Sequence, residues 1–556
     1  MADTTVTERP PTPGEVSATP DRVGRFEYKW IALAVVLSGT IMTILDSTIV
    51  NIAIPTLQRD LHAGSYTEIA WVVTGYLLAQ GAVIPLSGWA TDRWGTKRLY
   101  LITIVMFTVA SMLCGVSQNL GELIFFRVVQ GIGGGMLMPI GMTIILQAVG
   151  PQQMGRVMGI FGVPMLIAPA VGPVLGGWFV QDFTWRLIFY VNVPIGIIGF
   201  IAAIRFLRES RRTARLRLDV IGLLTGVPAV VALMYAVDRS TQLGWSSPQV
   251  VSLLVASAVL MAAFVRRQLR AREPLLQLSL FRDRTFSWAM ALSFVVVTAM
   301  FGTMLLLPLY LQEVHGYDAI ETGLLLLPQA AMAAVSMPLG GFLTDRIGPK
   351  WVVATGMILL TLGSILLAQI HYDSSNWLVI GALMLRGFAM GFAMMPTMSA
   401  ALARVPRQYT SRASSITNTL QRLSSSVGIA VLVTVLAGQF GTAASQTTCA
   451  PPATVVIAAA NALHQPGLTG PQYCGYLEQK IASSSAQESS GSAQPSTGNV
   501  VLDNFNRQFA GGVFSDAFDR TFVLIAILSA VGIIPAFFLR RPEREAAGSG
   551  GVQLVA

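Results

Sequence analysis

Charged residues are scarce in this chain of 556 residues. Asp, Glu, Lys and Arg together make up 12% of the sequence, whereas hydrophobic residues make up 53%. A soluble domain carries about 25% charged residues. The shortage of charge therefore excludes an ordinary soluble protein and indicates that most of the chain faces lipid.

Lysine, histidine and cysteine are also rare, and the sequence contains only 4 histidines and 3 cysteines. None of the lysines follows a glycine, so the Gly-Lys-Ser/Thr loop that holds nucleotide phosphates is absent. The histidines show no spacing typical of metal ligands. These absences exclude ATP hydrolysis by a phosphate-binding loop, leave no catalytic constellation for an enzyme, and predict a chain without a bound cofactor.

Long apolar runs dominate what the sequence does contain. About 20 mostly apolar residues span a bilayer as a helix, and runs of this length recur fourteen times. Six fall in 31–207 and six in 286–540, and a further pair falls in 208–285 with basic linkers. We therefore expect an all-α integral membrane protein with fourteen transmembrane helices, arranged as two six-helix lobes plus two inserted helices.

A charged motif repeats in the two halves of the chain. The segment GWATDRWGTKR returns as GFLTDRIGPK, and Asp92 and Arg93 correspond to Asp345 and Arg346 at one offset of 253 residues. Parallel repeats of this kind build two-lobed secondary transporters. Each acid could cap a neighbouring helix and each arginine could pair across the lobes, which predicts a latch at the cytoplasmic side. Ordinary charges flanking spans are the alternative.

The basic residues indicate how the spans are oriented. Most of the 37 Lys and Arg fall on connections that share one side of the membrane with both chain ends, and cytoplasmic loops carry such an excess. The sequence therefore predicts a multi-pass protein of the cytoplasmic membrane with both termini in the cytoplasm. Residues 1–30 are typical of a disordered tail, and 541–556 form a second cytoplasmic tail. Basic patches beside spans contact anionic lipid, so membrane lipid is an expected partner and nucleic acid is not.

A long polar connection at 438–518 precedes the last predicted span, 521–540, and falls on the extracytoplasmic side. It is rich in Ser, Gln and Ala, so we expect it to be mostly flexible or disordered apart from the apolar stretch 453–468. Cys449 and Cys474 lie in this loop, whereas the third cysteine lies in an apolar span. An oxidising outer compartment permits a disulfide between the two, and two free thiols are the alternative.

Charged residues inside spans are the strongest functional signal. Asp46 lies about nine residues, or roughly 13 Å of helix, before Pro55 at the outer end of the first span. Arg127 lies roughly 10 Å from the outer end of the fourth span. The two could pair or compete through a proton, and a static buried ion pair is the alternative. Arg386 and Arg422 lie in later spans. Arg422 follows Asn418 and Gln421, and it either lines a polar cavity or extends to the membrane–water interface.

The fifth span combines glycine and proline at close spacing. Its outer half contains Gly172, Pro173, Gly176 and Gly177. Small residues let helices approach closely, and proline weakens the backbone hydrogen bonds of a helix. The pattern predicts a helix that bends and slides during a conformational change, and a tightly packed static helix is the alternative.

Four motifs in the order of the chain resemble the major facilitator superfamily, specifically its fourteen-helix drug:proton antiporters. They are GWATDRWGTKR, LDSTIVNIAIP in the first span, RVVQGIGGG in the fourth and GVPMLIAPAVGPVLGG in the fifth. The resemblance implies proton coupling for Asp46 and Arg127, and an inner gate for Asp92 with Arg93. It also assigns the fifth-span motif to the conformational change. Thr96 and Pro349 depart from the pattern, which usually has a second basic residue there.

The resemblance implies a proton-coupled multidrug efflux transporter that exports amphipathic or cationic compounds by alternating access. Its partners would be an amphipathic small molecule and membrane lipid, with protons as the coupling ion; an accessory envelope protein is left open. Export of an endogenous lipid, siderophore or antibiotic is the alternative cargo. A membrane scaffold that moves nothing is a third reading, which the charge of Asp46 within a span argues against.

Overall fold

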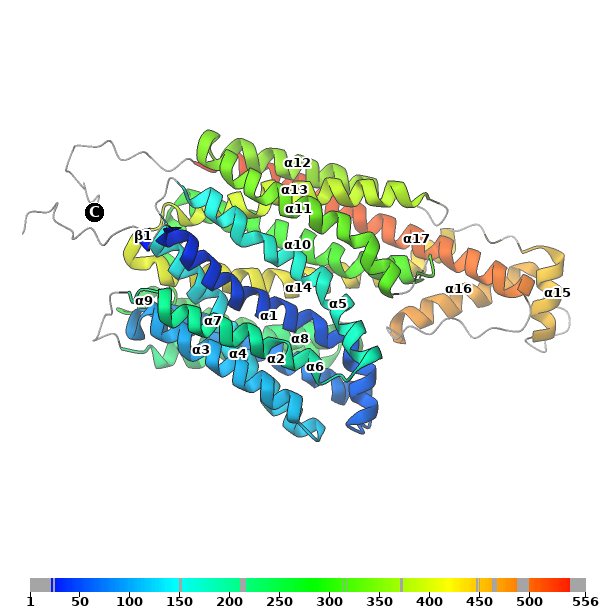
Figure 1. The fold of residues 1–556 in the computed structure, drawn as a ribbon. Helices are drawn as coiled ribbons and strands as arrows, with labels where there is room; N and C mark the ends of the chain where they lie inside the picture. The colour runs from blue at the N-terminus through cyan, green and yellow to red at the C-terminus, as the bar shows by residue number, and fades with distance from the viewer. Residues whose placement is uncertain are drawn as a thin grey trace, which may run out of the picture.

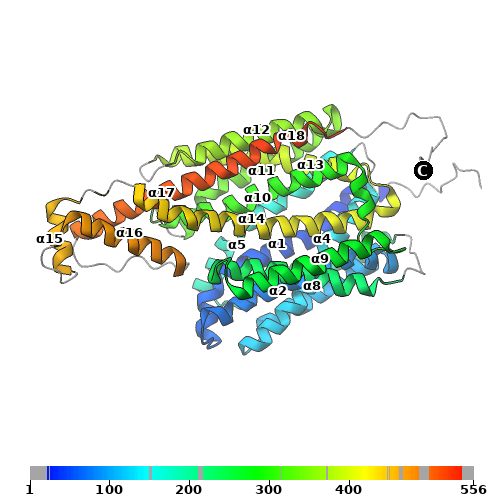
Figure 2. The ribbon, with the colours of Figure 1, turned by 180° about the vertical axis from the view of Figure 1, so that it is seen from behind.

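The structure is a computed structural model in which most of the chain is helical (Figures 1 and 2). The residues that it describes are 22–23, 26–149, 153–210, 217–313, 315–317, 319–370, 374–446, 449, 451–462, 468–487 and 500–540. Within them, fourteen helices are long and apolar enough to cross a membrane. This number confirms the fourteen spans that the sequence predicts.

The first lobe consists of six spans. Its helices are α1 (Tyr28–Asp60), α2 (Tyr66–Trp94), α3 (Thr96–Val116), α4 (Leu120–Ala148), α5 (Met154–Asp182), and the broken pair α6 (Leu187–Tyr190) and α7 (Asn192–Phe206). Two inserted spans follow, α8 (Val220–Leu243) and α9 (Pro248–Arg270). They pack against each other, and α8 also contacts α2 and a helix of the second lobe.

The second lobe has six spans as well. Its helices are α10 (Arg284–Glu313), α11 (Ala319–Ile347), α12 (Pro349–Leu367), α13 (Asn376–Leu402), α14 (Thr410–Gln446), and α17 (Val500–Val531) continued by α18 (Ile533–Ala536). Two short 3-10 turns, Leu278–Arg282 and Arg407–Tyr409, precede α10 and α14. The lobes meet where α5 packs against α11 and α13, and where α14 packs against α2 and α4.

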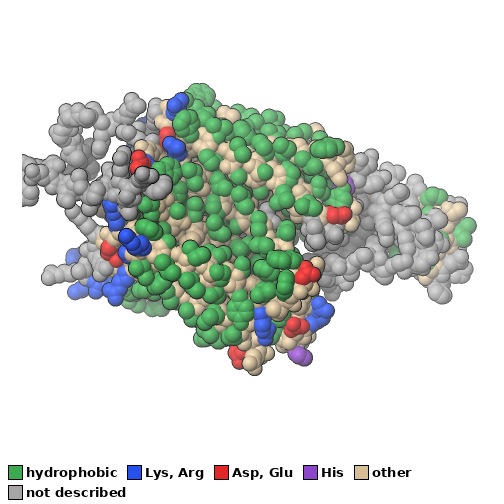
Figure 3. All heavy atoms as spheres, viewed as in Figure 1, with side chains coloured by type: hydrophobic (Ala, Val, Ile, Leu, Met, Phe, Trp, Pro, Cys, Tyr) green, Lys and Arg blue, Asp and Glu red, His purple; other side chains and the backbone are tan. Residues whose placement is uncertain are grey.

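The surface is divided along the long axis of the bundle. Apolar side chains cover its middle, and many of the visible Lys and Arg gather at the end on the left of Figure 3. We call this the basic end; it contains the junction of α2 and α3 at Gly95 and the junction of α11 and α12 at Gly348. We call the opposite end, from which α15 (Ala453–Ala462) and α16 (Gly470–Gln487) project, the loop end (Figure 1).

The loop predicted to be largely flexible or disordered is instead mostly helical in its described residues. Helix α14 continues to Gln446, α16 occupies Gly470–Gln487, and α17 begins at Val500, well before residue 521. The prediction is wrong because loss of apolar residues marks the end of lipid contact rather than the end of a helix, whose backbone bonds persist in water. A disulfide joins Cys449 to Cys474, with an S–S distance of 2.04 Å.

Part of the segment 1–30, which the sequence predicts to be a disordered tail, has regular structure. Strands Arg22–Val23 and Phe26–Glu27 pair as an antiparallel ribbon, and α1 already begins at Tyr28. The Tyr28 hydroxyl accepts a hydrogen bond from the backbone N–H of Arg208 at 3.0 Å, which ties the start of α1 to the end of the sixth span. The rest of the tail, and the predicted tail 541–556, lie outside the described residues.

Candidate functional site

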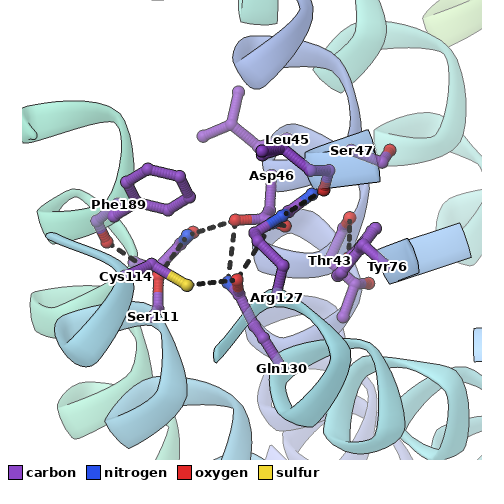
Figure 4. A network of polar contacts seen from close by, with 12 residues as sticks. Thr43, Leu45, Asp46, Ser47, Tyr76, Ser111, Cys114, Arg127, Gln130 and Phe189 are labelled. Atoms are coloured by element: carbon purple, nitrogen blue, oxygen red, sulfur yellow. Dashed lines mark hydrogen bonds and ion pairs between the residues drawn. The ribbon is translucent and has the colours of Figure 1, made fainter. Parts of the chain in front are cut away.

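Asp46 and Arg127 form a buried ion pair in the first lobe. Asp46 on α1 is 0% exposed and Arg127 on α4 is 1% exposed. Arg127 donates from Nη1 to Oδ2 of Asp46 at 2.7 Å (Figure 4). The similar depth of the two residues in their spans could not establish that they pair. The structure shows a direct ion pair, and it lies inside one lobe rather than between the two.

Two side-chain amides complete the shell of the Asp46 carboxylate. Gln130 donates from Nε2 to Oδ1 at 2.8 Å, and Asn192 of α7 donates from Nδ2 to the same oxygen at 2.9 Å. Asn192 also donates to the Ser111 hydroxyl of α3 at 3.0 Å, which in turn donates to the Phe189 carbonyl oxygen. With the Arg127 bond, the carboxylate accepts three hydrogen bonds from three directions, which stabilises its charge in a dry interior.

Arg127 is held from the other side by α2. Its Nε donates to the Val72 carbonyl oxygen at 3.0 Å, and its guanidinium carbon lies 3.9 Å from the centre of the Tyr76 ring. Nη1 also donates to Gln130 Oε1 at 2.9 Å. A buried ion pair is tolerated only when the remaining donors and acceptors are satisfied. Helices α1, α2, α3, α4 and α7 all contribute to that shell.

Gln130 and Asn192 are site residues that sequence reasoning missed. Gln130 follows Arg127 by three residues and so shares its helix face, a signal that was available in the RVVQ segment. Asn192 gives no comparable signal, because it stands alone at the start of a span and reaches Asp46 only through the packing of α7 against α1 and α3.

The glycine motif of α5 packs directly beside this network. A β carbon at Gly172 would collide with the Thr48 side chain, and one at Gly176 would lie 2.9 Å from the Ile49 carbonyl oxygen. Both contacts are on α1, within one turn of Asp46. Gly177, by contrast, has nothing within 4 Å of the position of a β carbon. Pro173 lies in the same stretch of α5.

The other half of α5 packs against the second lobe. At the basic end its backbone touches that of α11 so closely that a β carbon at Gly155 or at Gly341 would collide with the opposite carbonyl. One turn further in, Gly159 meets the backbone of Met337 and Pro338 in the same way. The single helix α5 therefore contacts α1 near Asp46 and α11 of the other lobe near the basic end.

The duplicated acids form bonds across the lobes at the basic end. The Asp345 carboxylate of α11 accepts from the backbone N–H groups of Gly155 and Arg156, at 2.8 and 2.9 Å, at the amino end of α5. The Asp92 carboxylate of α2 accepts from the Ser411 hydroxyl and from Nε of Arg412, at 3.3 Å, at the amino end of α14. Each acid thus sits at the amino end of a helix of the opposite lobe, where the helix dipole favours an anion.

Glycines that recur in the two copies of the motif allow these contacts between the lobes. Gly95 and Gly348, at the turns that end α2 and α11, have φ of 89° and 91°, values that favour glycine over other residues. Gly88 brings α2 against the backbone of Arg412, just as Gly341 brings α11 against Gly155. The two halves of the molecule therefore repeat one device: a glycine for close approach, an acid for the opposite helix and a glycine for the turn.

The comparison with known families decides the class of the protein. The model of the Major Facilitator Superfamily matches residues 36–429 of the chain. The chain belongs to this superfamily. It is thus a multi-pass membrane transporter and not an enzyme, as the sequence predicts.

Several curated relatives of this transporter are named as multidrug resistance proteins or multidrug transporters. Multidrug resistance protein B homolog of Mycobacterium tuberculosis (strain ATCC 25618 / H37Rv) is 36% identical over 406 residues, which cover 72% of this chain and 75% of the relative. Multidrug transporter protein MdtP of Bacillus subtilis (strain 168) is 31% identical over 380 residues, 68% of this chain and 70% of the relative. The fold is also similar to the solved proton:xylose symporter XylE, with a TM-score of 0.52, 12% identity, and coverage of 83% of this chain and 94% of that one.

The contacts of the two arginines in the transporter's repeated motif differ from those of the two acids. Arg93 forms no hydrogen bond or ion pair with the part of the chain that the structure describes, and the Arg346 guanidinium lies over the Phe342 ring of its own helix at 4.4 Å. The cross-lobe arginine at Asp92 is instead Arg412. For Arg93 the predicted pairing across the lobes is therefore wrong, because α14 presents its own base to Asp92.

Arg386 and Arg422 do not extend to the membrane–water interface. Arg386 is 0% exposed and donates to the hydroxyls of Ser364 and Thr303, the latter at 2.6 Å. Arg422 of α14 donates from Nη2 to Oε1 of Gln80, which is buried on α2 of the other lobe.

The described residues of the transporter contain no group of three or more His, Cys, Asp and Glu that could hold a metal ion. Burial lowers the pKa of His315, near the loop end.

Gly176→Leu and Gly177→Leu should differ in their effects. The leucine at 176 would press on the α1 backbone and lower the free energy of unfolding by about 1–3 kcal/mol, while also blocking exchange between the two open states of the transporter. The leucine at 177 has free space, so stability and exchange should stay near those of the native protein. Thermal unfolding and cysteine accessibility from both faces measure the two effects, and equal behaviour of the variants would contradict this packing.

Asp345→Ala should loosen the basic end. It removes two hydrogen bonds to a charged acceptor, worth about 1.5–3 kcal/mol each, and so should raise the labelling rate of a cysteine placed at Met337, which is buried at the lobe contact. Asp345→Asn keeps one carbonyl acceptor and should give an intermediate rate. Labelling that is unchanged in both variants would mean that the capping contact does not hold the gate.

Proposed function

We propose that this protein is a proton-coupled exporter of amphipathic compounds that works by alternating access. The observation that supports the proposal best is the Asp46 carboxylate, buried within a span and paired with Arg127. Every other carboxylate in the fourteen spans lies within about two helical turns of the end of its span. Asp46 is therefore the candidate for carrying a proton through the membrane interior.

Protonation of Asp46 would change the forces within the first lobe. A neutral carboxyl loses its Coulomb attraction to Arg127 and gains a proton to donate, so the Asp46–Arg127–Gln130 arrangement would no longer be balanced. An uncompensated arginine in a dry interior is costly. The lobe would relieve that cost by moving α1 or α4, which is the step that couples a proton to a conformational change.

Helix α5 provides a physical route from Asp46 to the gate. Its Gly172 and Gly176 lie against α1 beside Asp46, and its amino end is held by Asp345 of the second lobe. A shift of α1 would press on α5 through contacts that have no free space, and α5 would transmit it to the basic end as one helix. We propose that breaking the contacts of Asp92 and Asp345 opens the basic end.

We further propose that the basic end faces the cytoplasm of a cell whose cytoplasmic membrane holds the transporter. The excess of Lys and Arg on this side supports the orientation. Cargo would enter there when the gate opens and leave at the loop end, while a proton moves inward. The names of the drug-resistance relatives support export of foreign amphipathic compounds.

Asp46→Asn should abolish export driven by a pH gradient in proteoliposomes, because it removes the titratable proton but keeps the size and the acceptor oxygen. Asp46→Glu keeps the acid and serves as the matched control, with part of the activity retained. Arg127→Lys should likewise keep part of the transport and Arg127→Ala should stop it. Full gradient-driven export by Asp46→Asn would overturn the assignment of the proton site.

A further inference from the structure

Arg422 lies at the lobe interface near the middle of the membrane. It is ten residues beyond Arg412 on α14, roughly 15 Å further from the basic end. Its guanidinium bonds to Gln80 of α2, so the contact crosses from one lobe to the other. The side chain is partly exposed, unlike Asp46, Arg127 and Arg386. This placement puts a positively charged side chain at the contact between the two lobes.

The charge of Arg422 is not neutralised by any described residue. Its partner Gln80 is a neutral amide, and Arg422 takes part in none of the ion pairs of the described residues. Asp46 is the one carboxylate deep in a span, and it is enclosed by Arg127, Gln130 and Asn192. The interior near the lobe interface therefore carries an excess of positive charge.

The second lobe adds to this excess. Arg386 bonds to hydroxyls and to the Ala299 carbonyl oxygen at 3.1 Å, and to no carboxylate among the described residues. The repeat offset of 253 residues that relates Asp92 to Asp345 also relates Ser111 to Ser364 and Asp46 to Ala299. At this offset Asp46 corresponds to an alanine, although Arg386 is not the residue that corresponds to Arg127. The buried Arg386 thus has no carboxylate partner among the described residues.

A fixed positive charge at a ligand-binding position discriminates between ligands by their charge. In a medium of low dielectric constant, an unpaired arginine repels a cation and attracts an anion over several ångströms. A guanidinium also matches the oxygens of a carboxylate, sulfonate or phosphate in a two-pronged contact. Gln421, next to Arg422 and partly exposed, and Gln80 provide further amide donors at the same depth.

We propose that Arg422 is the recognition site for an anionic group on the cargo, so that this transporter exports amphipathic anions in preference to cations. The inference rests on the proposed function and specifies its substrate class, where the sequence led us to expect amphipathic or cationic compounds. In the structure the Arg422 guanidinium is hydrogen-bonded to Gln80. When the lobes separate, the anionic group of the cargo takes the place of Gln80 in this contact. Cargo with a carboxylate, sulfonate or phosphate then bonds to Arg422 of the second lobe.

Equilibrium binding of two matched probes to the purified protein tests the proposal. Diphenylhexatriene carrying a propionate group and diphenylhexatriene carrying a trimethylammonium group share one apolar body and differ in charge. The native protein should bind the propionate probe more tightly. Arg422→Gln should weaken its binding about ten-fold or more and leave the cationic probe unchanged or better bound, while Arg422→Lys should keep the anion preference.

Controls separate a local effect from a damaged fold. Arg270→Gln changes an exposed arginine at the end of α9 and should leave both affinities as in the native protein. Thermal unfolding of each variant reports whether the fold is intact. A native protein that prefers the cationic probe, or an intact Arg422→Gln variant with unchanged affinity for the propionate probe, would overturn the proposal.

Competition with lipids distinguishes two sources of the anionic group. Displacement of the propionate probe by phosphatidylglycerol, but not by phosphatidylcholine, assigns the site to lipid headgroups. Displacement by neither, with tight binding of the probe itself, assigns it to free amphipathic anions. Equal displacement by both lipids would contradict recognition of charge.

Binding is measured without a proton gradient, so it is independent of the proposed coupling. If Asp46→Asn exports normally but Arg422→Gln loses the anion preference, proton coupling through Asp46 fails and the charge selectivity stands. If Asp46→Asn is inactive while Arg422→Gln binds both probes as the native protein does, the selectivity fails and the coupling stands.

Discussion

The rest of the structure depends on the enclosure of one carboxylate in the membrane interior. A charge there is tolerated when it is paired and hydrogen-bonded. Arg127, Gln130 and Asn192 supply the donors to Asp46, and they come from α4 and α7, while α2 holds Arg127 from behind. Four helices of the first lobe, with α1, therefore meet at a single carboxylate, and in the proposed mechanism its protonation state sets their packing.

Close backbone contacts of α5 connect the surroundings of Asp46 to the basic end. Glycines at 172 and 176 leave α5 no clearance from α1, and glycines at 155 and 341 leave it none from α11. Without free volume, a displacement at one contact must appear at the other. In the proposed mechanism the acids of the repeated motif hold the two lobes together at the basic end, because each is bonded to the first turn of a helix in the opposite lobe.

Patterns local in sequence predicted the fold well and the site only in part. Apolar runs and the repeated motif predicted fourteen spans and two lobes, since both features depend on residues close together in the chain. The depth of Asp46 and Arg127 was readable in the same way. Asn192 and the Gln80–Arg422 contact were not, because they arise from helices far apart in sequence whose rotation about their axes is set by packing. The same reason separates Gly176 from Gly177, which the sequence treats alike.

The most direct measurement of the central claim is the distance between the lobes at the basic end as a function of pH. Spin labels at Trp94 and Ile347, which are 42% and 54% exposed on opposite lobes, report this distance by double electron–electron resonance in a background with Cys114 replaced. The account predicts that acidification changes the distance distribution of the native protein and that Asp46→Asn gives one distribution at every pH. The same pH dependence in both proteins would contradict control of the gate by Asp46.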